Sequence, residues 1–195
     1  MKNDSAYNNV DFIPDGAAYP DRWADEARAF REVEAAVGRA RLNVAYGDGA
    51  RQKMDVFYPS GKPEGLVVFV HGGYWLRFDR TDWSHFAAGL TARGWAVAMP
   101  SYTLAPQARI GEIAGEIVQA VSGAGDLVSG PIRLTGHSAG GQLVARVAVG
   151  EMLPEAVRER LAKVVPISPV GDLRPLMETT MNTDLQVDAG EAAAQ

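Results

Sequence analysis

Residues 132–141, IRLTGHSAGG, decide the fold of this 195-residue chain. The first four residues predict a strand, and a helical pattern begins just after Ser138. Small residues flank a serine where a strand turns sharply into a helix, and this turn exposes the hydroxyl at the end of a parallel sheet. Ser138 is therefore the candidate nucleophile. The alternative is a glycine-rich turn with an idle serine.

The same alternation of strand and helix patterns extends along the chain. LVVFV (66–70) and WAVAMP (95–100) predict two further buried strands, and VVPIS (164–168) predicts another apolar strand. LNVAY (42–46) and KMDVFYP (53–59) surround Asp48-Gly49 and predict an antiparallel hairpin. Apolar residues at helical spacing predict helices over 21–37, 81–93, 110–121, after Ser138 and near 154–163. We therefore expect an α/β fold with a mostly parallel sheet and helices on both faces.

One domain is expected from the length of the chain. Residues 1–20 are polar and contain two prolines, so they predict an N-terminal arm; residues 21–195 predict a single α/β domain. No strand pattern follows Gly171, so the sheet should end with 164–168 at or near an edge. An apolar strand at an open edge is usually covered. We therefore expect the C-terminal strands of the fold to be missing from this chain.

Composition narrows the class of protein. The net charge of −5 and the pI of about 5.2 argue against nucleic acid as a partner. The absence of cysteine excludes disulfides and thiolate chemistry and fits a reducing compartment. The polar start of the chain does not resemble a signal peptide, and no apolar run is long enough to span a membrane. A cytoplasmic protein is expected.

A second glycine motif, His71-Gly72-Gly73-Tyr74-Trp75, follows the strand predicted over 66–70. Glycines let the backbone approach a reacting carbonyl and direct N–H groups at it, as a hydrolase oxyanion loop requires. The N–H of Ala139, at the start of the helix after Ser138, would be a further donor. His71 is expected to be a structural hydrogen-bonding residue rather than a base.

These motifs resemble the α/β-hydrolase superfamily and, within it, the kynurenine formamidase (arylformamidase) family. The resemblance rests on HGGYW (71–75) and GHSAGGQL (136–143), with further similarity in YNN (7–9), SYTLAP (101–106) and SPVGDLRPL (168–176). It implies Ser138 as nucleophile, Gly72, Gly73 and Ala139 as oxyanion donors, and Tyr74 and Trp75 near the substrate. For the two aromatic residues, packing in the wall of the site is an open alternative. No metal or organic cofactor is implied.

The resemblance does not supply the other two members of a catalytic triad. In the family the aspartate and histidine come after two further strands, and no position of this chain matches either. His137 should project away from Ser138, and His85 is expected to be a surface or packing residue. Asp172 is expected to shape a loop. A fragment is the favoured explanation, ahead of an inactive relative of the enzymes or a base supplied by another subunit.

The function expected for the complete protein is hydrolysis of the N-formyl amide of an arylamine, with N-formyl-L-kynurenine giving formate and kynurenine. This chain alone is expected to be weak or inactive. The alternatives are a carboxylesterase acting on small esters and a non-catalytic domain that binds ligands in the same cleft. The expected partner is a small-molecule substrate, and a homodimer stays open.

Overall fold

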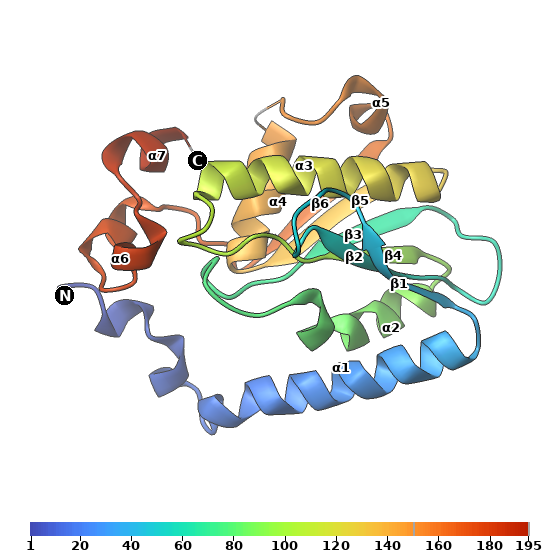
Figure 1. Ribbon diagram of the computed structural model, residues 1–195, viewed down its shortest axis with the longest axis horizontal. Coiled ribbons are helices and arrows are strands. Elements are labelled where there is room, and N and C mark those ends of the chain that lie inside the picture. Colours follow the sequence, from blue (N-terminus) through green and yellow to red (C-terminus); the bar gives the residue numbers. More distant parts are fainter. Residues whose placement is uncertain (150, 195) are drawn as a thin grey trace.

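A six-stranded sheet in the order β1-β2-β4-β3-β5-β6 forms the centre of the computed structural model, which describes residues 1–149 and 151–194 (Figure 1). The strands are β1 (Ala40–Ala45), β2 (Lys53–Phe57), β3 (Leu66–Val70), β4 (Ala96–Pro100), β5 (Ile132–His137) and β6 (Leu161–Ile167). Strands β4, β3, β5 and β6 are parallel, and β2 is antiparallel to both β1 and β4. The mostly parallel sheet and the leading hairpin are confirmed. The antiparallel β2–β4 pair is a feature that we did not predict.

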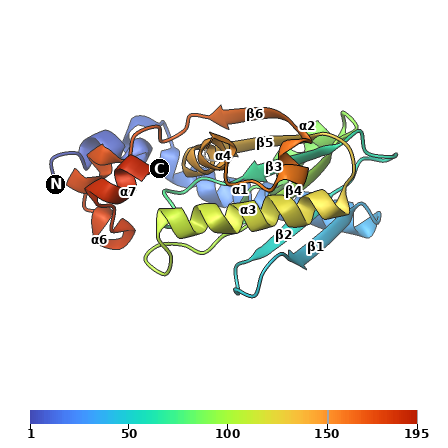
Figure 2. The ribbon, with the colours of Figure 1, turned by 90° about the horizontal axis from the view of Figure 1, so that it is seen from above.

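Helices cover both faces of the sheet. Helices α3 and α4 lie on one face, and α1 and α2 lie on the other (Figures 1 and 2). The helices are α1 (Tyr19–Ala36), α2 (Ala88–Thr91), α3 (Ile110–Leu127), α4 (Ala139–Val149), α5 (Glu155–Arg158), α6 (Asn182–Leu185) and α7 (Ala189–Ala194). Short 3-10 helices span Ser5–Tyr7, Asn9–Phe12, Gly16–Ala18, Arg80–Asp82, Ser84–Ala87 and Arg174–Glu178.

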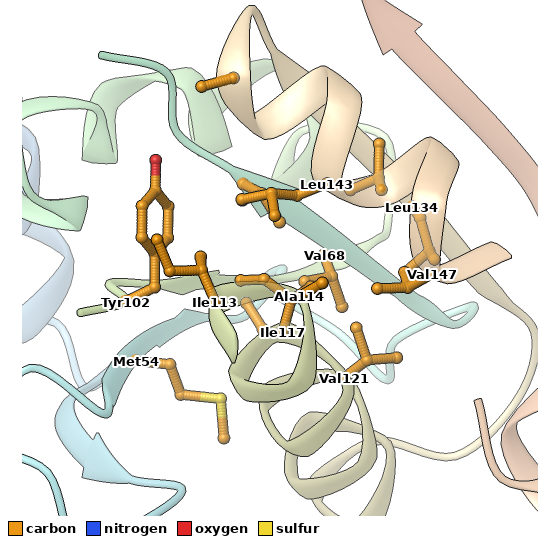
Figure 3. Close-up of a cluster of buried hydrophobic side chains, with 14 of the residues drawn as sticks. Met54, Val68, Tyr102, Ile113, Ala114, Ile117, Val121, Leu134, Leu143 and Val147 are labelled. Atoms are coloured by element: carbon orange, nitrogen blue, oxygen red, sulfur yellow. The ribbon is translucent and has the colours of Figure 1, made fainter. Parts of the chain in front are cut away.

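Two hydrophobic cores result from the alternation of side chains along the central strands. Val68 packs into the larger core beneath α3 and α4, and its neighbour Phe69 packs into the smaller core beneath α1 and α2. Figure 3 shows the larger core, where Ile113 and Ile117 of α3 meet Leu143 of α4. Continuous apolar runs are needed in β3 and β4 because both of their faces are buried.

Three segments differ from the sequence prediction. The helix expected over 81–93 is broken into two 3-10 helices and the short α2, because Asp79 caps the first turn and Trp83 interrupts it. The helix expected near 154–163 ends at Arg158, and β6 already begins at Leu161. In α1, Val33 is 57% exposed, although its spacing placed it on the buried face.

Strand β6 is an edge strand, as the sequence predicted. It bonds to β5 on one side, and its residues Val165 and Ile167 are 40% and 44% exposed. At the other edge lies β1, whose side chains are at most half-buried. Among the described helices, none combines the length and the apolar character needed to cross a bilayer.

The N-terminal arm, defined here as residues 1–18, lies beside the C-terminal helices although the two are far apart in sequence (Figures 1 and 2). Asp4 accepts hydrogen bonds from the backbone N–H and the hydroxyl of Thr180, both at 2.6 Å. Asn3 donates its backbone N–H to the carbonyl oxygen of Glu178 and its amide to that of Pro175. The arm therefore has one end attached to residues 175–180 and the other continuous with α1.

Candidate active site

The turn after β5 holds Ser138 in a left-handed conformation, with φ of 54°. This conformation costs an L-residue about 1–2 kcal/mol, so the surrounding backbone must enforce it. The Ser138 N–H donates to the carbonyl oxygen of Ile167 in the next strand at 2.9 Å, and its own carbonyl oxygen accepts from the N–H of Gln142 in α4. The serine side chain is half-buried at the point where strand becomes helix.

Glycines are required around the serine because backbone packs directly on backbone. A Cβ on Gly140 would lie 2.1 Å from the carbonyl oxygen of Val70, and one on Gly136 would lie 2.3 Å from that of Gly140. Real Cβ atoms do not approach other atoms so closely. The G-x-S-x-G pattern therefore brings the start of α4 against the end of β3.

Register in the sheet brings the two glycine motifs together. β3 and β5 are parallel neighbours in which Val70 pairs with Gly136, so the segments after both strands emerge at the same edge. A Cβ on Gly72 would lie 3.2 Å from the Cβ of Ser138. Ligand sites of parallel α/β sheets lie at this carboxyl edge.

The loop that contains Gly72 and Gly73 uses its carbonyl oxygens but leaves its amides free. The carbonyl oxygen of Gly73 accepts from Leu76 and Arg77, and that of Gly72 accepts from Nδ1 of His71 at 2.8 Å. Among the described residues, the N–H groups of Gly72 and Gly73 donate to no acceptor. Ala139 begins α4, so its N–H also lacks a partner within the helix. The amides of Gly72, Gly73 and Ala139 thus have no acceptor among the backbone hydrogen bonds of the described residues.

A buried ion pair anchors the far end of the same loop. The guanidinium of Arg80 contacts the carboxylate of Asp55 on β2 at 3.1 Å, and Asp55 is fully buried. Arg80 also donates to the hydroxyl of Ser101 at 2.9 Å. Sequence reasoning missed this network because its members are far apart in the chain. An aspartate within the otherwise apolar run 54–57 was the available signal.

The three histidines do not contact the Ser138 hydroxyl through any hydrogen bond among the described residues. The ring of His71 is stacked on Tyr102 at 4.3 Å, and burial lowers its pKa to about 4. The ring of His137 packs on Trp83 at 5.5 Å, and burial lowers its pKa as well. His85 lies 3.5 Å from Glu26 of α1. The structural role expected of His71 agrees with this placement.

Asp172 lies in the loop after β6 and accepts hydrogen bonds from the backbone and the guanidinium of Arg174. These bonds hold the pKa of the Asp172 carboxyl near 2. The residue borders the site but is engaged in shaping its own loop.

Two cavities meet at Ser138. The larger, about 620 Å³, has mainly apolar walls, and the smaller, about 290 Å³, has more polar walls and reaches Asp172. Ser138, Tyr74, Asn9 and Ser168 border both of them. The structure thus places Tyr74 in the walls of both cavities. Trp75 is instead fully buried in the larger core, so its side chain packs behind the loop rather than along either cavity.

Comparisons with known proteins agree with this geometry. Residues 67–193 match a family model of the alpha/beta hydrolase fold. Kynurenine formamidase from Danio rerio is 28% identical over 86% of this chain, and that from Salmo salar is 30% identical over 75%. The chain spans 63% and 51% of the lengths of these two relatives.

Solved structures give the same fold. A crystal structure from Silicibacter sp., provisionally described as a thioesterase, has 55% sequence identity and a TM-score of 0.96; the match covers all of this chain and 73% of the other. Esterase B from Lactobacillus rhamnosis, at 22% identity and a TM-score of 0.58, matches 86% of this chain and 62% of its own and shares the fold. The family match covers well over half of the chain, and the chain therefore belongs to the α/β-hydrolase fold family.

Proposed function

We propose that the complete protein is a serine hydrolase that cleaves the N-formyl amide of an arylamine, with N-formyl-L-kynurenine as the expected substrate. The observation that carries this proposal is that Ser138 lies at the same edge of the sheet as Gly72 and Gly73, whose N–H groups donate to no acceptor among the described residues. The sequence similarity to kynurenine formamidases supports the formamide as substrate. The expected products are formate and the free arylamine.

The roles of these groups follow from the negative charge that develops on the carbonyl oxygen of the substrate during attack. The Ser138 hydroxyl oxygen attacks the formyl carbon, and the former carbonyl oxygen becomes an oxyanion that the amides of Gly72, Gly73 and Ala139 stabilise. One lost donor of this kind typically costs about 2.7–4 kcal/mol of transition-state stabilisation. The amine then leaves with a proton, and water releases formate from the seryl ester.

A general base must accept the serine proton, and the buried, low-pKa His71 and the packed His137 do not meet that need. In this proposal the base histidine and its acid come from residues outside 1–195. Loss of the base lowers kcat by about 10⁶ in a serine hydrolase. The assays below therefore use the natively expressed, full-length protein, and its intact mass is measured first against 20.9 kDa.

The first test compares Ser138→Ala with Ser60→Ala, an exposed serine in the loop after β2. We expect Ser138→Ala to lose formamide hydrolysis by a factor of about 10⁴–10⁶ and to lose labelling by a fluorophosphonate. Ser60→Ala should behave as the parent protein does. If the parent protein is labelled at another residue, or not at all, Ser138 is not the nucleophile.

A carboxylesterase is the second candidate function. The similar solved structure that is described as a thioesterase supports this candidate. The discriminating measurement is kcat/KM for N-formylkynurenine against that for p-nitrophenyl acetate. A negligible formamidase rate beside a fast ester rate would contradict the first proposal and support the second.

A further inference from the structure

One wall of the larger cavity comes from the N-terminal arm rather than from the two glycine motifs. Val10, Ile13 and Gly16 of the arm line this cavity together with Ser138 and Gly73. Val10 is half-buried, whereas the neighbouring Phe12 is 71% exposed and does not line the cavity. The arm therefore presents one side to the cavity and the other to solvent.

Another part of the cavity wall is aromatic. The rings of Trp23 and Trp83 lie 4.9 Å apart, and Trp23 also approaches Phe78 edge-on at 6.3 Å. All three line the larger cavity, and Trp23 comes from α1, directly after the arm. Stacked and edge-on ring arrangements are favourable for a further aromatic ring. A cavity with these walls suits a flat aryl group.

The arm is held over Ser138 at defined points. The hydroxyl of Tyr74, in the oxyanion loop, donates to the carbonyl oxygen of Tyr7 at 3.0 Å. Asp4 and Asn3 attach the beginning of the arm to residues 175–180. Between these contacts and α1, Asn9 borders both cavities. The arm thus separates a mainly apolar space from a more polar one directly at the serine.

We propose that the N-terminal arm is a specificity element of the active site, in which Val10 and Ile13 close the larger cavity around the aryl group of the substrate. This inference rests on the proposed function for the identity of the scissile bond. The polar cavity on the other side of Asn9 then receives the small formyl side and water. The arm acts on the choice of leaving group and leaves the acyl chemistry to the glycine motifs.

The test uses two esters with the same acyl group, phenyl formate and ethyl formate, so that only the leaving group differs. Val10→Trp fills the larger cavity and should lower kcat/KM for phenyl formate at least about tenfold, the scale of a lost apolar pocket contact. The rate for ethyl formate should stay within about twofold. Phe12→Trp, which places the same indole side chain on the solvent side of the arm, is the control.

Binding gives a readout that does not require turnover. Formanilide, the simplest N-formyl arylamine, is titrated by calorimetry into Ser138→Ala, which cannot hydrolyse it, and into Ser138→Ala that also carries Val10→Trp or Phe12→Trp. We expect its Kd to rise about tenfold only in the variant that carries Val10→Trp. Equal effects of the two variants, or equal losses for both esters, would overturn the role of the arm. If the parent protein hydrolyses neither ester but formanilide binding follows this pattern, the proposed function fails while the aryl site stands.

Discussion

Two segments border the Ser138 hydroxyl, and they are held in opposite ways. The elbow junction, residues 70–73 and 136–141, is built from backbone packed on backbone at the centre of the sheet. The arm consists of short 3-10 turns attached by a few side-chain hydrogen bonds. The parts proposed for bond cleavage are therefore immobilised by the fold, whereas the part proposed for substrate choice is attached to its surface.

The largest expected difference in stability is between two glycine-to-alanine variants, one in the elbow junction and one in the arm. Gly140→Ala puts a Cβ 2.1 Å from the Val70 carbonyl oxygen within the rigid junction, and it should lower the free energy of unfolding by about 4 kcal/mol or more. Gly16→Ala also meets backbone, at 2.7 Å from the Val10 carbonyl oxygen, but the arm can shift. We expect it to cost less than about 1 kcal/mol. Urea denaturation of both variants checks this, and similar losses would contradict the comparison.

The second prediction concerns His71 in the elbow junction and the loss of protein stability at acidic pH. Burial lowers the pKa of His71 from its ordinary 6.5 to about 4, so the unfolded chain binds a proton more readily than the folded one. Stability from this group is complete above pH 6.5 and is lost as the pH falls to about 4, a change of about 3 kcal/mol. Denaturation of the parent protein and His71→Gln over this range should show a steeper loss in the parent. Parallel curves would mean that His71 is not the titrating group.

The third prediction tests the strain at the nucleophile. Ser138→Gly removes the cost of a positive φ, partly offset by the greater freedom of glycine in the unfolded chain, and should stabilise the protein by up to about 1 kcal/mol. It should also abolish hydrolysis. Ser5→Gly, in a 3-10 turn of the arm, is the control and should not stabilise. A destabilised Ser138→Gly would show that the serine side chain contributes more than the strain costs.

The smallest effect is expected in the arm. Asp4→Ala removes both bonds to Thr180 and should leave the melting temperature nearly unchanged while chymotrypsin cuts faster after the exposed Phe12. Asp11→Ala, which loses only a bond to Asn8 within the arm, is the matched control. The N-terminal amine and Thr180 lower the pKa of Asp4 to about 2, so this attachment should weaken only as the pH falls from about 4 towards 2. Equal cleavage rates would mean that Asp4 does not retain the arm.

Sequence patterns predicted the junction far better than the arm. Strand β3 has the predicted bounds because a run buried on both faces must be apolar throughout, and glycine spacing reports close backbone contact directly. The position of Trp75 could not be read in this way, because Tyr74 and Trp75 lie in a turn with positive φ, where the alternation of side chains along a strand does not apply. The position of the arm over the cavity depends on contacts between residues more than 170 positions apart in the chain, such as Asn3 and Pro175. No local sequence pattern encodes such contacts.

The pairing of Val70 with Gly136 has a consequence for how this site can change. Gly72 lies two residues after Val70, and Ser138 lies two residues after Gly136. The register of the two strands therefore fixes how far the Gly72 amide lies from the Ser138 hydroxyl. A single residue inserted into β3 or β5 would move one group by about 3.3 Å past the other and turn it to the opposite face. The site should therefore tolerate apolar replacements of similar size along β3, but no replacement of Gly136 and no change in the length of either strand.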